Sequence, residues 1–284
     1  MTQLSQQQSG FDLRPSASFF GAEVGDLEDL HAGVVACCGV FCDHYGSSSP
    51  GGRFFARQMR YCSSDPWTRN KLGYGVNGIV DVGDLNVYPL EATRLGEVLR
   101  EQTHRIIETG ARIFIANGGF GVTAALVAGI ADAIPEKKLH VVRVSRCSDQ
   151  KPVGANAPLA VPRRQAASRI IEVLEGREDA YTWFPSCRAL ATDVDLEALG
   201  KPIFLSIDAD ILDPIYGDTG SYRGISGDRP EDVIKLVDRF RGLQVVGAEM
   251  TGHLPSFELH GRQETEFSVA ICASIVDMLR EVPR

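Results

Sequence analysis

Short runs of apolar and β-branched residues alternate along the chain with longer segments whose apolar residues recur every three or four positions. The short runs predict buried strands at residues 33–40, 112–117, 139–144, 203–207 and 244–249. The longer segments predict helices at 92–109, 122–133, 162–175, 267–280 and 230–239, the last capped by Asp228. This alternation predicts an α/β fold with three layers, in which helices cover both faces of a mostly parallel central sheet.

Two carboxylates follow one of these strands. Asp208 and Asp210 stand on the same side of the chain, because side chains alternate along a strand. Functional loops of parallel sheets gather at the carboxyl ends of the strands, and paired carboxylates there suit a divalent cation. The same spacing is also typical of aspartates that cap a turn. The D-x-D pattern alone leaves both interpretations open.

The wider segment at residues 206–214, SIDADILDP, closely resembles the ureohydrolase family, the arginases and agmatinases. Further segments resemble the family at residues 20–21, 40–44, 49–54, 80–85 and 245–249. The similarity runs in unbroken order over residues 19–280, and it implies the arginase-like α/β/α fold. Enzymes of this family hydrolyse guanidino groups to urea and an amine at a two-manganese centre.

The catalytic motifs are where the sequence departs from the family. Phe120 stands where the motif G-G-D-H-S has its metal-binding histidine. In the motif D-A-H-x-D, Ser145 replaces the bridging aspartate and Cys147 replaces the histidine. Gly252 stands in place of the substrate-binding glutamate. By this resemblance, half of the six ligand positions have lost their residue type.

Asp149, Asp208 and Asp210 keep the residue type of the family's metal ligands. Two divalent ions a few ångströms apart repel each other, and without the bridging carboxylate and both imidazoles the dinuclear manganese centre is not expected. The three aspartates predict at most one divalent ion, manganese or zinc, with Cys147 as a further ligand in the case of zinc. Without a metal, clustered carboxylates raise one another's pKa.

Cys147 has two interpretations. It can be a small buried residue that took the place of a lost ligand, since free cysteine packs well inside proteins. It can also be a nucleophile, with His253 on a neighbouring loop as its base. Asp210 is the third catalytic candidate, either as a carboxylate that activates water or through a bound metal ion.

Two loops of the family's active-site rim are altered. Residues 214–226 form a shorter loop than in the family, and residues 151–160 lack the histidine expected there. The remodelled rim implies a changed substrate or none. By their place in the family's pattern, four residues are candidates for contacting a substrate: Phe120, Asp218, Thr219 and Glu249.

Composition limits the number of domains, the possible partners and the cellular location. With 284 residues, 44% of them hydrophobic, the chain can bury one full core, which we place at residues 19–284 after a polar extension at 1–18. A formal net charge of −8 argues against nucleic acids and anionic membranes as partners. The seven cysteines lack zinc-finger spacing, and the glutamine-rich start is unlike a signal peptide, which together predict reduced thiols and a cytoplasmic protein.

Two classes of function follow from these features. The first is a divergent ureohydrolase-fold enzyme that acts on a C–N bond of a guanidino, amidino or amide substrate, with a reduced metal site or metal-independent chemistry. The alternative is a catalytically inactive arginase- or agmatinase-like protein with a structural or regulatory role. The family resemblance implies a homo-oligomer, a trimer or a hexamer, in either case.

Overall fold

The structure is a computed structural model, and the described residues are 17–42, 51–85, 92–119, 122–134, 139–152, 160–175, 188–190, 196, 202–216, 227–253 and 262–281. For residues 92–93, 146–152, 160–175, 188–190 and 262–264 the description covers the backbone alone. The predicted boundary between an extension and a domain at residue 18 stays a prediction.

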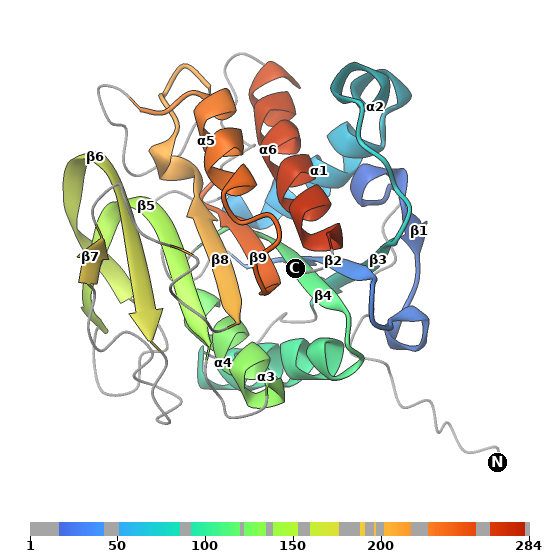
Figure 1. Ribbon diagram of the computed structural model, residues 1–284, viewed down its shortest axis with the longest axis horizontal. Helices are drawn as coiled ribbons and strands as arrows, with labels where there is room; N and C mark the ends of the chain where they lie inside the picture. Colours follow the sequence, from blue (N-terminus) through green and yellow to red (C-terminus); the bar gives the residue numbers. More distant parts are fainter. Residues whose placement is uncertain are drawn as a thin grey trace.

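The described strands form one sheet in the order β1-β3-β2-β4-β9-β8-β5-β6-β7 (Figure 1). Their bounds are β1 Glu23–Val24, β2 Val35–Val40, β3 Ile79–Leu85, β4 Arg112–Asn117, β5 His140–Pro152, β6 Ala160–Glu175, β7 Arg188–Leu190, β8 Ile203–Asp208 and β9 Val245–Thr251. The first seven strands in this order, from β1 through β9 and β8 to β5, pair in parallel. The last two, β6 and β7, add antiparallel pairs at one edge. The predicted mostly parallel sheet is confirmed.

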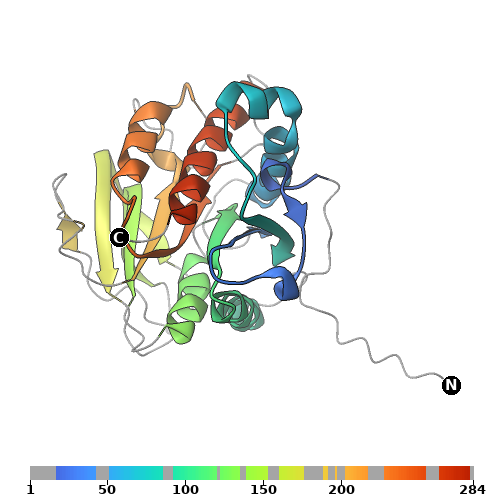
Figure 2. The same ribbon diagram turned by 45° about the vertical axis from the view of Figure 1, so that its right-hand side comes forward.

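Helices cover both faces of this sheet, as the two ribbon views agree (Figures 1 and 2). Helices α3 (Ala92–Glu108) and α4 (Thr123–Ala133) lie on one face, and α1 (Phe55–Ser64), α5 (Pro230–Asp238) and α6 (Arg262–Arg280) lie on the other. The remaining helical segments are α2 Pro66–Leu72 and the 3-10 turns η1 Phe19–Gly21, η2 Leu27–Asp29, η3 Gly52–Phe54 and η7 Ala209–Ile211. None of the helices described combines the length and apolar character needed to cross a membrane.

Side-chain alternation divides the core into two layers. Phe114, Leu205 and Ala248 point to the layer under α1, α5 and α6. Ile113 and Phe204, each one residue earlier, point to the layer under α3 and α4. The strands are therefore buried on both faces, which explains why they read as nearly continuous apolar runs in the sequence.

The predicted helix at 162–175 is wrong, because this segment is the strand β6. It pairs antiparallel with β5, with Ile171 opposite Val144 and Val173 opposite Val142. Cross-strand pairing of β-branched residues is a long-range property that local periodicity does not reveal. The partner strand is also longer than predicted, so that Cys147 and Asp149 lie within β5 rather than in a loop at its end.

The predicted capping of α5 by Asp228 is wrong as well. The residue before the helix is Arg229, which makes no capping hydrogen bond through its side chain, and Pro230 opens the first turn. Asp228 instead pairs through its backbone, donating to the carbonyl of Ile211 at 2.8 Å and accepting from Asp213 at 3.0 Å.

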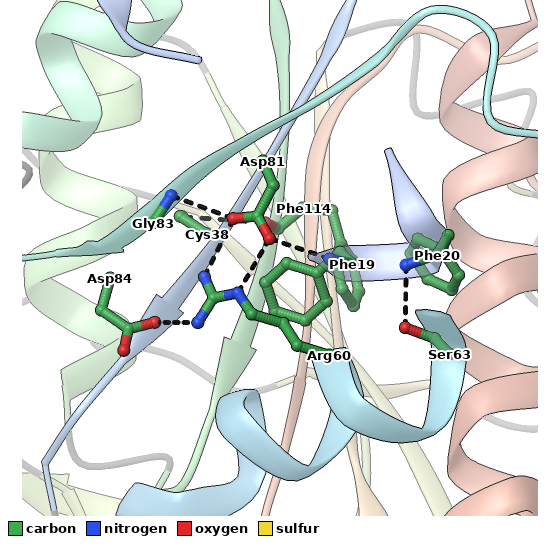
Figure 3. A network of polar contacts seen from close by, with 9 residues as sticks. All are labelled: Phe19, Phe20, Cys38, Arg60, Ser63, Asp81, Gly83, Asp84 and Phe114. Atoms are coloured by element: carbon green, nitrogen blue, oxygen red, sulfur yellow. Dashed lines mark hydrogen bonds and ion pairs between the residues drawn. The ribbon is translucent and has the colours of Figure 1, made fainter. Parts of the chain in front are cut away.

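A buried arginine joins three elements near the β1–β3 edge of the sheet (Figure 3). Arg60 of α1 donates to both oxygens of Asp81 on β3, at 2.8 Å and 3.0 Å, and to Asp84 at 2.5 Å. The Asp81 carboxylate also accepts from the backbone N–H groups of Phe19, at 2.8 Å, and Gly83, at 2.9 Å. One ion pair thus holds η1, α1 and β3 together.

Neighbouring carboxylates keep this arginine protonated although it is buried. Burial lowers the pKa of Arg60, but Asp81 and Asp84 more than offset this effect and the net shift is upward. The guanidinium also lies over the ring of Phe19, 4.3 Å from its centroid. The bidentate geometry and complete burial distinguish this pair from a surface salt bridge.

Arg60→Met should destabilise the protein by roughly 3–5 kcal/mol, because it leaves the Asp81 carboxylate buried without its counter-charge. The matched control is Arg94→Met, which removes an arginine that is 64% exposed and pairs with Glu97 at 3.0 Å on α3. This control should change the free energy of unfolding by less than about 1 kcal/mol. Urea unfolding measures both, and equal losses in the two variants would contradict the assigned role.

Candidate active site

Side chains on the α4 face of the sheet form rows across β4, β9, β8 and β5, because these strands pair in register. The lowest row is apolar and consists of Ile113, Gly247, Phe204 and Val141. The next row, towards the carboxyl ends, consists of Ile115, Glu249, Ser206 and Arg143. The row above it pairs Asn117 with Thr251 and Thr251 with Asp208. The sheet face therefore changes from apolar to polar within two residues along each strand.

Glu249 is the centre of the polar rows. It is fully buried, and its Oε1 accepts hydrogen bonds from the hydroxyls of Thr123 on α4 and Ser206 on β8, both at 2.7 Å. Its Oε2 accepts from the amide of Asn117 on β4 at 3.2 Å. The Asn117 oxygen in turn accepts from the backbone N–H of Gly119 at 3.2 Å. One carboxylate thereby connects β4, β8, β9 and the start of α4.

The two aspartates of the D-x-D segment lie at the end of β8. Asp208 is the last residue of the strand and caps η7, its Oδ1 accepting from the backbone N–H of Asp210 at 3.1 Å. Its Oδ2 lies 3.7 Å from Nη2 of Arg143. Oδ2 of Asp210 accepts from the hydroxyl of Ser145 at 3.0 Å. Each aspartate thus accepts a hydrogen bond from the protein, and Asp208 also faces the Arg143 guanidinium.

Burial dominates the electrostatics of Asp208. Loss of solvent raises the pKa of its carboxyl group well above the ordinary value, and the nearby charge of Asp210 raises it further. The positive charge of Arg143 opposes both effects. The predicted mutual raising of pKa among the carboxylates is therefore confirmed in direction at Asp208, although burial is the larger cause.

The end of β9 packs directly against Asp208. Gly252 has a φ of +84°, and a Cβ atom there would lie 2.3 Å from Oδ1 of Asp208. A glutamate at this position would meet both the left-handed backbone and the carboxylate. The glycine is thus required by the arrangement of the two strand ends.

Residues 34–152 match the profile of the arginase family. Over these residues the chain is similar to the arginase family. It is 23% identical over 285 residues to a mitochondrial guanidino acid hydrolase of Homo sapiens, covering 87% of this chain and 81% of the relative. It is also 23% identical over 298 residues to a mitochondrial agmatinase of Gallus gallus, covering 90% of this chain and 86% of the relative.

Solved structures support the same fold. The proclavaminate amidino hydrolase of Streptomyces clavuligerus superposes with a TM-score of 0.68 at 18% identity, covering 94% of this chain and 98% of that one. The arginase of Bacillus subtilis superposes with a TM-score of 0.60 at 15% identity, covering 86% of this chain and 98% of that one. The arginase-like fold predicted from the sequence is confirmed.

The structure places the predicted site residues in different surroundings. Asp208 and Asp210 lie together with Ser145, and Glu249 lies one row away. His253 instead packs against the ring of Phe55 on α1, with 5.1 Å between centroids, and its Nδ1 lies 3.3 Å from the hydroxyl of Ser268 on α6. These contacts come from helices on the face of the sheet opposite to α4.

The structure describes other predicted site residues by their backbone alone or not at all. Cys147 and Asp149 lie in β5 opposite Gln165 and Pro162 of β6, and their side chains are outside the described part. Phe120, Asp218 and Thr219 lie outside the described residues. The Cys147–His253 pair and the substrate contacts therefore stay predictions.

Sequence reasoning missed the row members Arg143, Ser206, Asn117 and Thr251, and also Thr123 of α4, which contacts Glu249. A signal for the first was present, since Arg143 stands between valines in a segment predicted to be buried and alternates with Ser145. A charged residue in such a position needs a buried partner. The partner itself depends on the register between β5 and β8, which the sequence does not display.

The described side chains alone do not supply the donors of the two-manganese centre that the resemblance implies. A hydroxyl stands at Ser145 where a bridging carboxylate would be needed, and it is already bonded to Asp210. The carboxylate of Asp208 is engaged by the backbone of η7 and by a buried cation. Within the described part of the chain, no group of three or more His, Cys, Asp or Glu residues is arranged to hold a metal ion.

Glu249→Gln should make the protein's stability less dependent on pH. Burial raises the pKa of Glu249, and the hydrogen bonds from Thr123, Ser206 and Asn117 and the charge of Arg143 offset this only in part. A raised pKa in the folded state stabilises the fold below the unfolded-state value, about 4.3, and that contribution is lost as pH rises through the folded-state value. The wild-type advantage over Glu249→Gln should therefore shrink from mildly acidic to neutral pH.

Urea unfolding of both proteins across this pH range measures the difference. Glu23→Gln is the control, because Glu23 is exposed on the edge strand β1. Its difference from the wild type should vary less with pH. A wild-type advantage over Glu249→Gln that grows towards neutral pH would show that the carboxylate is stabilised, not strained, by its surroundings.

Proposed function

We propose that this chain is a divergent hydrolase of the arginase fold that breaks a C–N bond in a guanidino, amidino or amide substrate with protein groups in place of a two-manganese centre. The observation that carries the proposal is the retention of Asp208 and Asp210 at the carboxyl end of β8, beside the Ser145 hydroxyl. Relatives named for guanidino acid and agmatine hydrolysis align with most of the chain, which supports the substrate class.

Carboxylates suit such a substrate. A guanidinium group is planar and cationic, and carboxylate oxygens accept its N–H groups in pairs. In the proposed reaction Asp210 takes a proton from the water that attacks the guanidino carbon and returns it to the amine nitrogen as the C–N bond breaks. The products are urea and the protonated amine. The hydrogen bond from Ser145 holds the Asp210 carboxylate in a fixed orientation.

Cys147 offers a covalent variant of this reaction. Its thiolate would attack the same carbon, the amine would leave with the proton of the thiol, and water would then release the bound group. His253, the base expected from the sequence, would have to leave its contacts with Phe55 and Ser268 to take part.

The proposed substrate contacts are Phe120, Asp218 and Thr219. Glu249, the fourth residue expected from the sequence, is fully buried and bonded to the protein on both oxygens. A single ion held by Asp149, Asp208 and Asp210 is the competing proposal, and the assays below distinguish it.

The second candidate is a non-catalytic relative. The specific observation in its favour is that the carboxylates of Asp208 and Glu249 are engaged by donors of the protein itself. Such a protein would keep the fold for assembly or regulation. The expected trimer or hexamer and the cytoplasmic location stay predictions in both cases.

Asp210→Asn should lower kcat/KM by about 10²-fold or more, because general bases contribute roughly 10²–10⁴-fold to such reactions. The assay follows urea and ammonia release from agmatine, guanidino acids and simple amides by metal-stripped protein. Asp232→Asn is the control, since Asp232 is exposed on α5 and pairs with Lys235. Cys147→Ala in the same assay distinguishes the covalent variant.

Three outcomes would each contradict a different part of this proposal. Turnover that appears only after manganese or zinc is restored would refute metal-independent chemistry and favour the single-ion site. Release of neither product from any substrate, with or without metal, would leave the non-catalytic candidate. Full activity in Asp210→Asn would remove that residue from the mechanism.

A further inference from the structure

Arg143 is a buried cation in the middle of β5 to which the reaction proposed above assigns no role. It is 3% exposed, and its Nη2 lies 3.7 Å from Oδ2 of Asp208. Burying an arginine charge is costly unless a carboxylate lies close to it. The position of this side chain against Asp208 is therefore a feature of the fold that requires an explanation.

The charge of Arg143 acts on more than one carboxyl group. Its guanidinium lies beside Asp208, and its charge also opposes the rise that burial causes in the pKa of Glu249. The register explains this reach, because Arg143 pairs with Ser206 and Ser206 pairs with Glu249 in the next strand. The guanidinium thus lies within the same buried cluster as the two acids.

Ser145, two residues further along the same strand, completes the pattern. Its hydroxyl donates to Asp210 at 3.0 Å, so that β5 supplies one contact to each aspartate of the D-x-D segment. A hydroxyl brings no negative charge, and an arginine brings a positive one. Both residues therefore make the surroundings of Asp208 and Asp210 less attractive to a divalent cation.

We propose that the Arg143 guanidinium is the built-in counter-charge of the Asp208–Asp210 pair and excludes a divalent cation from it. An arginine side chain stays protonated at every physiological pH, so this counter-charge is permanent. A divalent ion between the aspartates would face a fixed positive charge a few ångströms away in a buried setting, where repulsion is poorly screened. The inference holds whether or not the chain is an enzyme.

Manganese binding to the metal-stripped full chain tests the proposal, with free Mn²⁺ followed by its electron paramagnetic resonance signal. The variants are Arg143→Met, Ser145→Asp and the two combined. The wild type should show no saturable binding, and the combined variant should bind one ion at least roughly tenfold more tightly than the wild type. Arg143→Lys keeps the charge and should behave like the wild type.

Asp208→Asn, added to the combined variant, should abolish the gained binding and thereby locate it. Saturable binding of one ion by the wild type that is lost in Asp208→Asn would overturn the proposal. A folded combined variant that binds manganese no better than the wild type would overturn it too. No substrate is present in these titrations, so a failure of the proposed hydrolase activity does not affect their outcome.

A stability cycle keeps the proposal testable if Arg143→Met folds poorly. Removal of the arginine leaves Asp208 as an uncompensated buried acid, so that adding Asp208→Asn should raise the urea midpoint above that of Arg143→Met alone. This recovery is the expected result. Strictly additive losses from the two substitutions would show that the charges do not compensate each other.

Discussion

The hydrogen bonds to the carboxylate of Glu249 are the interaction on which the arrangement of the strand ends depends. This glutamate accepts hydrogen bonds from three side chains that belong to β4, β8 and α4, while its own backbone pairs with strands on both sides. A buried polar network of this kind stabilises one arrangement only when its members are satisfied together. Because the same strands also carry Asn117, Ser206 and Asp208, fixing their register fixes which polar groups meet.

The second constraint is charge. The rows of the α4 face contain Asp208 and Glu249 with little solvent, and burial raises the pKa of both. In the family that the sequence resembles, metal ions neutralise such a cluster of carboxylates. In this chain the Ser145 hydroxyl donates a hydrogen bond to one of them, and the Arg143 guanidinium places a positive charge beside another. The proposed chemistry at Asp210 relies on these groups in place of a dinuclear centre.

Much of the fold was predictable from local pattern. The bounds of β4 were predicted without error, and β8 and β9 differ from prediction by one or two residues, because apolar β-branched runs identify buried strands wherever they occur. Asp208 and Asp210 were recognised because their spacing is local. The segment 160–175 was misread and the contacts of Arg143 and Thr123 were missed, because both depend on which strand or helix lies alongside. His253 followed the family's loop in sequence, yet it packs between α1 and α6.

The most direct test of the central claim is a crystal structure of the full chain grown with excess manganese, with anomalous diffraction recorded at the manganese edge. We expect no anomalous peak at Asp208 and Asp210, with the Arg143 guanidinium paired to Asp208 and the Ser145 hydroxyl bonded to Asp210. An anomalous peak between the two aspartates, with the arginine turned away, would contradict this expectation.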